Sequence, residues 1–220
     1  MGKSITLTAS DGHTLSAYEA GFADAPRALV VVQEIFGVNH HIRAVCDGFA
    51  DAGYHVIAPA LFDRLERGVE LGYAGDDAKK AFALYGKIDA DKALIDVLAA
   101  ADALNRPTLG IVGYCFGGFM VWQAATRSDR FKAAVAWYGG GIAKSKDARP
   151  HCPVQLHFGD KDDHIPLSDV EAIRAAQPGV EIFVYEGAGH GFGCSERGSY
   201  EPRSTALAQE RTLAFLQHNL

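Results

Sequence analysis

The sequence predicts an α/β protein with a doubly wound, mostly parallel sheet flanked by helices. Short apolar runs alternate with segments of helical periodicity along the chain. The run at 28–32 is wholly apolar, as is typical of a strand covered on both faces. A third observation is the order of strand, glycine-rich turn and helix over residues 108–127. With 220 residues, 48% of them hydrophobic, we expect a single domain over residues 1–220.

The first half begins with a predicted hairpin, because residues 5–8 and 14–19 alternate in polarity around Asp11-Gly12. After the strand at 28–32 we expect a loop at 33–39 and a helix at 41–52, which Gly53 ends. A strand at 54–58 follows and ends at Pro59. The stretch from Leu61 to Gly75 is irregular and charged, as in a lid over the sheet.

The second half continues the alternation of helices and strands, which favours parallel pairing. Helices are predicted at 76–85, 89–104, 119–127, 167–176 and 202–218. Strands are predicted at 109–112, 131–137, 154–158 and 180–185.

Composition excludes several classes of protein. The formal net charge of −6 provides no basic footprint for nucleic acid. No apolar run is long enough to predict a membrane span, and we recognise no signal peptide. The four cysteines form no Cys-x-x-Cys pair, which argues against zinc sites and redox dithiols and favours a reducing, cytoplasmic location.

Gly113-Tyr114-Cys115-Phe116-Gly117 predicts a nucleophile elbow, usually written Gly-x-Ser-x-Gly, with a thiol in place of the hydroxyl. Its glycines allow the sharp turn between strand and helix. The backbone N–H of Phe116 would then point to where an oxyanion forms. The alternative is a buried structural cysteine in a glycine-rich turn.

Two later strand ends carry a possible acid and base. Asp160, Asp162 and Asp163 follow the strand at 154–158, and His190 follows the strand at 180–185. The order nucleophile, acid, histidine suits a hydrolytic triad, in which His190 moves protons and an aspartate orients it. The residues alone leave the three aspartates as alternatives, and each could instead form a turn or carry a solvated charge.

Glu34 directly follows the apolar strand at 28–32. Burial there would raise the pKa of its carboxyl group, and a position near Cys115 would let it exchange a proton with the thiol. The alternative is a carboxylate in a surface loop.

These motifs together resemble the dienelactone hydrolase (carboxymethylenebutenolidase) family, which has an α/β-hydrolase fold. The resemblance covers nearly the whole chain and is carried by segments 32–39, 113–118, 137–139, 189–192 and 208–213. It implies a Cys115-His190-Asp162 triad, with Ile165-Pro166 fixing the register of the acid.

The resemblance also implies roles around the thiol. Glu34 would take the thiol proton once substrate binds, and the N–H groups of Ile35 and Phe116 would form the oxyanion hole. Tyr138 would line the site.

The chain departs from the family in its cations, because both arginines that bind the substrate carboxylate are missing from their aligned places. Arg64, Lys79, Lys80 and Arg197 are the candidates to replace them. A lysine would hold a carboxylate as a point charge, without a bidentate fork.

We therefore expect a cofactor-independent cysteine hydrolase of esters or lactones that passes through an acyl-thioester and acts as a monomer. The alternatives are a hydrolase of another activated carbonyl, such as a thioester, and a non-catalytic binding relative. A metallohydrolase is disfavoured, because His40, His41 and His164 lack the usual ligand spacing.

Overall fold

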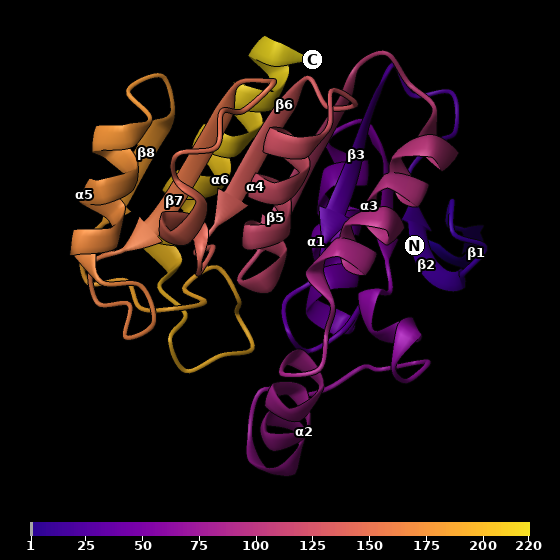
Figure 1. Ribbon diagram of the computed structural model, residues 1–220, viewed down its shortest axis with the longest axis horizontal. Coiled ribbons are helices and arrows are strands. Elements are labelled where there is room, and N and C mark those ends of the chain that lie inside the picture. Colours follow the sequence, from indigo (N-terminus) through magenta and orange to yellow (C-terminus); the bar gives the residue numbers. More distant parts are fainter. Residues whose placement is uncertain (1) are drawn as a thin grey trace. The chain divides into compact units, whose positions relative to one another are not determined.

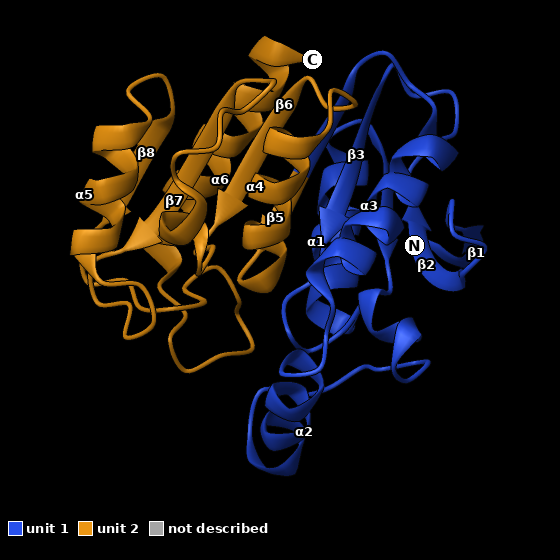
Figure 2. Cartoon of the chain, in the orientation of Figure 1, with its two compact units in different colours: residues 1–111 blue, residues 112–220 orange. Residues whose placement is uncertain are grey.

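The computed structural model describes residues 2–220, which form two compact units (Figure 2). Of the described residues, 2–111 form unit 1 and 112–220 form unit 2. The expectation of one domain over residues 1–220 stays a prediction.

The strands of unit 1 follow the order β1-β2-β4-β3. The predicted hairpin is β1 (Lys3–Thr8) paired antiparallel with β2 (Thr14–Ala20), in a register that places Thr8 opposite Thr14. β4 (Tyr54–Pro59) pairs antiparallel with β2 and parallel with β3 (Arg27–Val32). Every β3 residue after Arg27 is buried, as its apolar run predicts.

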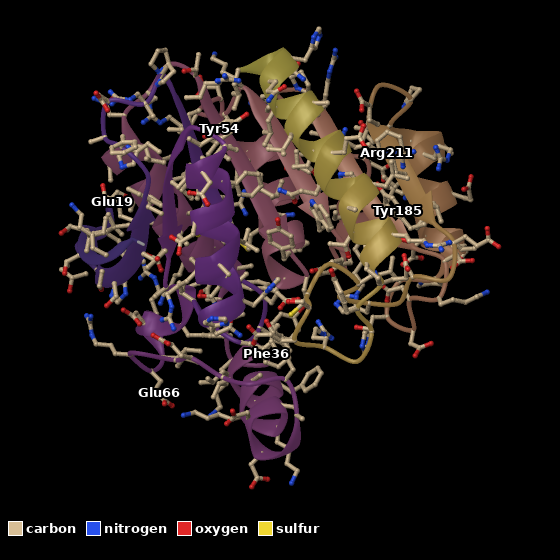
Figure 3. The ribbon with its side chains drawn as sticks, turned by 180° about the vertical axis from the view of Figure 1, so that it is seen from behind. Glu19, Phe36, Tyr54, Glu66, Tyr185 and Arg211 are labelled. Atoms are coloured by element: carbon tan, nitrogen blue, oxygen red, sulfur yellow. The ribbon has the colours of Figure 1, made fainter. Side chains whose placement is uncertain are left out.

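Two helices cover opposite faces of the unit 1 strands. α3 (Ala90–Leu104) lies in front of them in Figure 1, and α1 (His40–Asp51) lies in front in Figure 3, which is viewed from behind. Asn39 caps α1 and Asp89 caps α3 through their side-chain oxygens. The predicted lid-like stretch contains the short 3₁₀-helix η1 (Leu61–Arg64) and leads into α2 (Gly75–Tyr85).

The strands of unit 2 follow the order β5-β6-β7-β8, with β5 (Leu109–Tyr114) beginning in unit 1. β6 (Ala133–Trp137) pairs parallel with β7 (Val154–Gly159), which pairs parallel with β8 (Glu181–Tyr185). Their carboxyl ends therefore lie at one edge, where loops from successive strands converge.

Helices also cover both faces of the unit 2 strands. α4 (Phe116–Arg127) lies in front in Figure 1, and α6 (Pro202–Asn219) lies in front in Figure 3. Figure 3 also labels Arg211 on α6, whose guanidinium lies 5.4 Å from the ring centre of Tyr185 on β8. The unit is completed by α5 (Leu167–Ala176) and the 3₁₀-helix η2 (Ile142–Ser145).

One helix begins earlier than predicted. α4 starts at Phe116, directly after Cys115, whereas the sequence predicts Phe119 as the first residue. Gly117 and Gly118 have low helix propensity, and this hides the first turn. Gly118 is required by packing, because a Cβ there would lie 2.8 Å from the Cα of Gly139.

No helix among residues 2–220 combines the length and the apolar character needed to cross a membrane.

Candidate active site

Cys115 occupies the predicted sharp turn between β5 and α4. Its φ of 55° and ψ of −114° are rare for a residue with a side chain. The turn is held by a hydrogen bond of 3.0 Å from its N–H to the carbonyl of Trp137. Gly113 has to be glycine, because a Cβ there would lie 2.2 Å from the carbonyl oxygen of Gly117. The result is a partly exposed thiol at the N-terminus of a helix.

His190 joins this thiol to a buried carboxylate. Its Nε2 lies 3.1 Å from Sγ of Cys115, and its Nδ1 lies 2.8 Å from Oδ2 of Asp162. The other oxygen of Asp162 accepts the N–H groups of His164 and Ile165, at 2.8 and 3.1 Å. Thiol, imidazole and carboxylate therefore form one chain of hydrogen bonds within unit 2.

The other two candidate aspartates have different surroundings. Asp160 accepts the N–H of Gly187 at 2.6 Å, so it ties the loop after β7 to the loop after β8. Asp163 is exposed. Only Asp162, among these three, contacts the His190 ring in the hydrogen bonds of the structure.

The hydrogen bonds decide the protonation of His190. Burial acts to lower its pKa, but the bonds to Asp162 and Cys115 outweigh burial and raise the pKa of His190 to about 10. Both partners therefore favour the imidazolium form of His190.

Aromatic rings and a serine hold His190 in place. The Tyr138 ring meets the imidazole edge-on, with ring centres 5.3 Å apart. His164 meets it in the same way at 4.9 Å. The hydroxyl of Ser199 donates to the His190 carbonyl at 2.6 Å. Tyr138 is a predicted site residue, whereas His164 was considered only as a metal ligand. Its place two residues after Asp162 was the signal for a position beside His190.

A cavity of about 510 Å³ opens beside His190 within unit 2. Besides His190 itself, three side chains of its lining can carry positive charge: Lys161, His164 and Arg197. Asp163 and Glu201 also line it, but Glu201 caps α6 by accepting the N–H groups of Arg203 and Ser204. The cavity can therefore hold a polar or anionic group next to the imidazole.

The predicted site residues of unit 1 lie at the end of β3 and in the stretch beyond β4. Glu34 and Ile35 are buried, so Glu34 is not the surface carboxylate of the alternative interpretation. The phenol of Tyr73, which the sequence analysis missed, donates to Oε2 of Glu34 at 2.9 Å.

The three predicted substrate cations of unit 1 all contact carboxylates. Arg64 donates two hydrogen bonds of 2.7 Å to buried Asp96 and also binds Asp11. Lys79 pairs with Asp76, and Lys80 pairs with Glu66.

Taken within either unit alone, residues 2–220 contain no cluster of three His, Cys, Asp or Glu side chains spaced to share a metal ion.

Comparisons with known proteins agree with this architecture. The model of the dienelactone hydrolase family matches residues 15–220. A carboxymethylenebutenolidase from Pseudomonas putida is 33% identical, over 96% of this chain and 94% of its own. One from Pseudomonas knackmussii has the same identity and coverage.

A crystal structure from Klebsiella pneumoniae, named as a candidate dienelactone hydrolase, is 32% identical. It superposes with a TM-score of 0.83 and covers 99% of both chains. The predicted α/β-hydrolase fold is thereby confirmed.

Proposed function

The chain belongs to the dienelactone hydrolase family, and we propose that it hydrolyses carboxylic esters or lactones through a Cys115 acyl-thioester. The observation that carries the proposal is the chain of hydrogen bonds Cys115–His190–Asp162. It supplies a nucleophile, a proton carrier and an orienting carboxylate without a cofactor.

The proposed reaction has two steps. The thiol proton of Cys115, taken first by Glu34, passes to His190 as Sγ attacks the carbonyl carbon. The ester C–O bond then breaks, and the leaving oxygen takes that proton from His190. Water then gives a proton to His190 and attacks the thioester, so that the acid leaves and the thiol regains its proton. Asp162 keeps Nε2 of the imidazole directed at sulfur throughout.

Two backbone N–H groups would stabilise the oxyanion of both steps. That of Phe116 belongs to the first turn of α4, where the helix dipole favours negative charge. The family resemblance supplies Ile35 as the second donor and Glu34 as the group that takes the thiol proton. The burial of both residues supports these roles.

Among the proposed substrate cations, Arg197 is the one that lines the cavity beside His190. We therefore expect Arg197→Ala to raise the KM of carboxylate-bearing substrates more than that of neutral esters. Arg64→Gln and Lys79→Ala are the comparison variants, because Arg64 and Lys79 bind carboxylates of their own unit.

The test is steady-state hydrolysis of a panel of acidic and neutral esters, lactones and thioesters by the wild type and by Cys115→Ala. We expect turnover that Cys115→Ala abolishes without loss of the fold by circular dichroism. Cys152→Ala is the matched control, since Cys152 is also partly exposed but burial raises its pKa to about 11.

Wild-type rates in Cys115→Ala would refute the nucleophile. Labelling of Cys115 without turnover of any panel member would favour the non-catalytic binding relative instead. Faster turnover of thioesters than of esters and lactones would instead support the alternative of a thioester hydrolase.

We further propose a monomer in a reducing cytoplasm, where the thiol stays reduced. The four cysteines are free. Size-exclusion chromatography with light scattering tests the monomer, and a dimer mass would refute it.

A further inference from the structure

Tyr73 lies in the stretch between η1 and α2, to which the sequence analysis assigned no chemistry. Its phenol lies 2.9 Å from Oε2 of Glu34. Glu34 itself is fully buried at the end of β3. A phenol that donates to a buried carboxylate stabilises the charge and fixes its direction.

The direction of this hydrogen bond follows from Asn39. Oδ1 of Asn39 accepts the N–H of Ile42, and its Nδ2 donates to the carbonyl of Leu71 at 3.0 Å. The amide is therefore fixed with Nδ2 toward Tyr73, whose oxygen lies 3.2 Å away and has to accept. The single phenolic proton is then left for Glu34, and Oε2 accepts it.

The backbone around Tyr73 is also fixed to the loop that carries Glu34. The N–H of Leu71 donates to the carbonyl of Phe36 at 2.9 Å, and Gly37 forms a β-bridge with Glu70. The ring of Phe36, labelled in Figure 3, packs 4.5 Å from that of Tyr73. Residues 70–73 thus hold the loop after β3 in place.

We propose that Tyr73 is a positioning residue that holds the carboxyl group of Glu34 correctly directed for proton transfer. This role rests on the proposed function, because Glu34 acts there on the Cys115 thiol. The lid-like stretch would then contribute to catalysis, because its residues 70–73 hold the loop that carries Glu34.

The test compares Tyr73→Phe with the wild type. The variant keeps the ring that packs on Phe36 and removes only the hydroxyl. We expect kcat to fall about tenfold, the effect of one charge-assisted hydrogen bond, while KM stays within about twofold. Tyr18→Phe is the matched control, because the Tyr18 phenol also donates to a carboxylate of unit 1, that of Asp47, at 2.9 Å.

A double-mutant cycle separates positioning from a structural role. If Tyr73 acts through Glu34, adding Tyr73→Phe to Glu34→Gln lowers kcat no further. If Tyr73→Phe lowers kcat equally in the wild type and in Glu34→Gln, the inference is overturned. A wild-type kcat in Tyr73→Phe, or an unchanged kcat in Glu34→Gln, would also overturn it. Thermal unfolding of Tyr73→Phe and Tyr18→Phe shows whether a loss of kcat reflects lost stability.

A second readout needs no substrate, so it also decides the inference if the proposed hydrolysis fails. Iodoacetate carries a carboxylate and is attacked by the thiol, so it stands in for a substrate when Glu34 takes the thiol proton. The rate at which it alkylates Cys115 should fall in Glu34→Gln. Tyr73→Phe should change it in the same direction, and the double variant should match Glu34→Gln. Alkylation of Tyr73→Phe at the wild-type rate overturns the role of Tyr73, whether or not a substrate turns over.

Discussion

The Asp162 carboxylate divides its two oxygens between the His190 ring and the backbone of its own loop. Asp162→Asn keeps the shape but puts an amide where Nδ1–H of His190 needs an acceptor, so the ring no longer has a fixed tautomer. We expect the rate constant kcat to fall by about 10³- to 10⁴-fold.

Asp163→Asn is the matched control for this prediction, because Asp163 is the exposed neighbour in the same loop. Its kcat should stay within about threefold of the wild type, as for a surface substitution. The reverse order of the two losses, measured by steady-state kinetics, would show that the acid is misassigned.

The backbone of Cys115 predicts a conflict between stability and function. A side chain at φ 55° and ψ −114° is strained, whereas glycine adopts these angles freely. We expect the free energy of unfolding of Cys115→Gly to exceed that of Cys115→Ala by about 1 kcal/mol. Urea unfolding of the two inactive variants measures this difference, and equal values would show that the turn stores no strain.

Residues differ in how far the sequence alone predicts them. Cys115 and His190 stand out because glycines surround each of them next to a predicted strand or helix. Asp162 does not, since three aspartates lie in one loop and only the family register separates them. Tyr73 is beyond sequence reasoning, because its contact with Glu34 spans 39 positions and depends on the path of an irregular segment.

At the scale of elements, the turn from β5 to α4 depends on close backbone packing. Gly113→Ala would place a methyl group 2.2 Å from the carbonyl oxygen of Gly117 and 2.8 Å from Val121. The start of α4 then has to move, which we expect to lower the free energy of unfolding by about 1–3 kcal/mol. Displacement of the Phe116 N–H should also lower turnover.

Gly48→Ala in α1 is the matched substitution, because no atom lies within 4 Å of a Cβ at that position. There alanine should stabilise the helix by about 0.5–1 kcal/mol. Denaturant unfolding of both variants tests the pair. A Gly113→Ala protein as stable and active as the wild type would refute the packing argument.

Elements follow from the sequence wherever local signals agree. The apolar run of β3 and the Asp11-Gly12 turn between β1 and β2 each predict the observed element. The early start of α4 could not be predicted, because its glycines serve packing against Gly139 rather than helix propensity.

At the scale of the whole molecule, two histidines, His157 in the core and His190 in the active site, set opposite pH limits on stability. His157 is fully buried, and burial and the charge of Arg211 lower its pKa to about 3. Its Nε2 faces Oε1 of Gln155 at 2.8 Å, so it carries the proton. Its Nδ1 therefore accepts from the phenol of Tyr185, also at 2.8 Å. A second proton would break that bond inside the core.

The sign of each effect follows from the pKa in the folded chain and the value of about 6.5 in the unfolded chain. The pKa of His190 is raised to about 10, so its stabilisation is full below pH 6.5 and is lost as the pH rises toward 10. The pKa of His157 is lowered, so unfolding is favoured as the pH falls from 6.5 toward 3. Below pH 6.5, His190 therefore does not change the free energy of unfolding with pH. In the same range His157 lowers the free energy of unfolding by up to about 1.4 kcal/mol for each unit by which the pH falls.

This separation gives a test on the whole protein. Between pH 6.5 and 5 the free energy of unfolding of the wild type should fall by about 2 kcal/mol more than that of His157→Gln, which keeps a donor and an acceptor but does not titrate. Chemical denaturation at both values measures the difference, and NMR of the folded protein should show no titration of His157 above pH 4.5. Equal losses of the free energy of unfolding in the two proteins, or an imidazole of His157 that titrates near pH 6, would show that His157 does not limit acid stability.

Asp162→Asn removes the main partner that raises the pKa of His190. In this variant the free energy of unfolding should therefore change less with pH between 6.5 and 10, and only in that range.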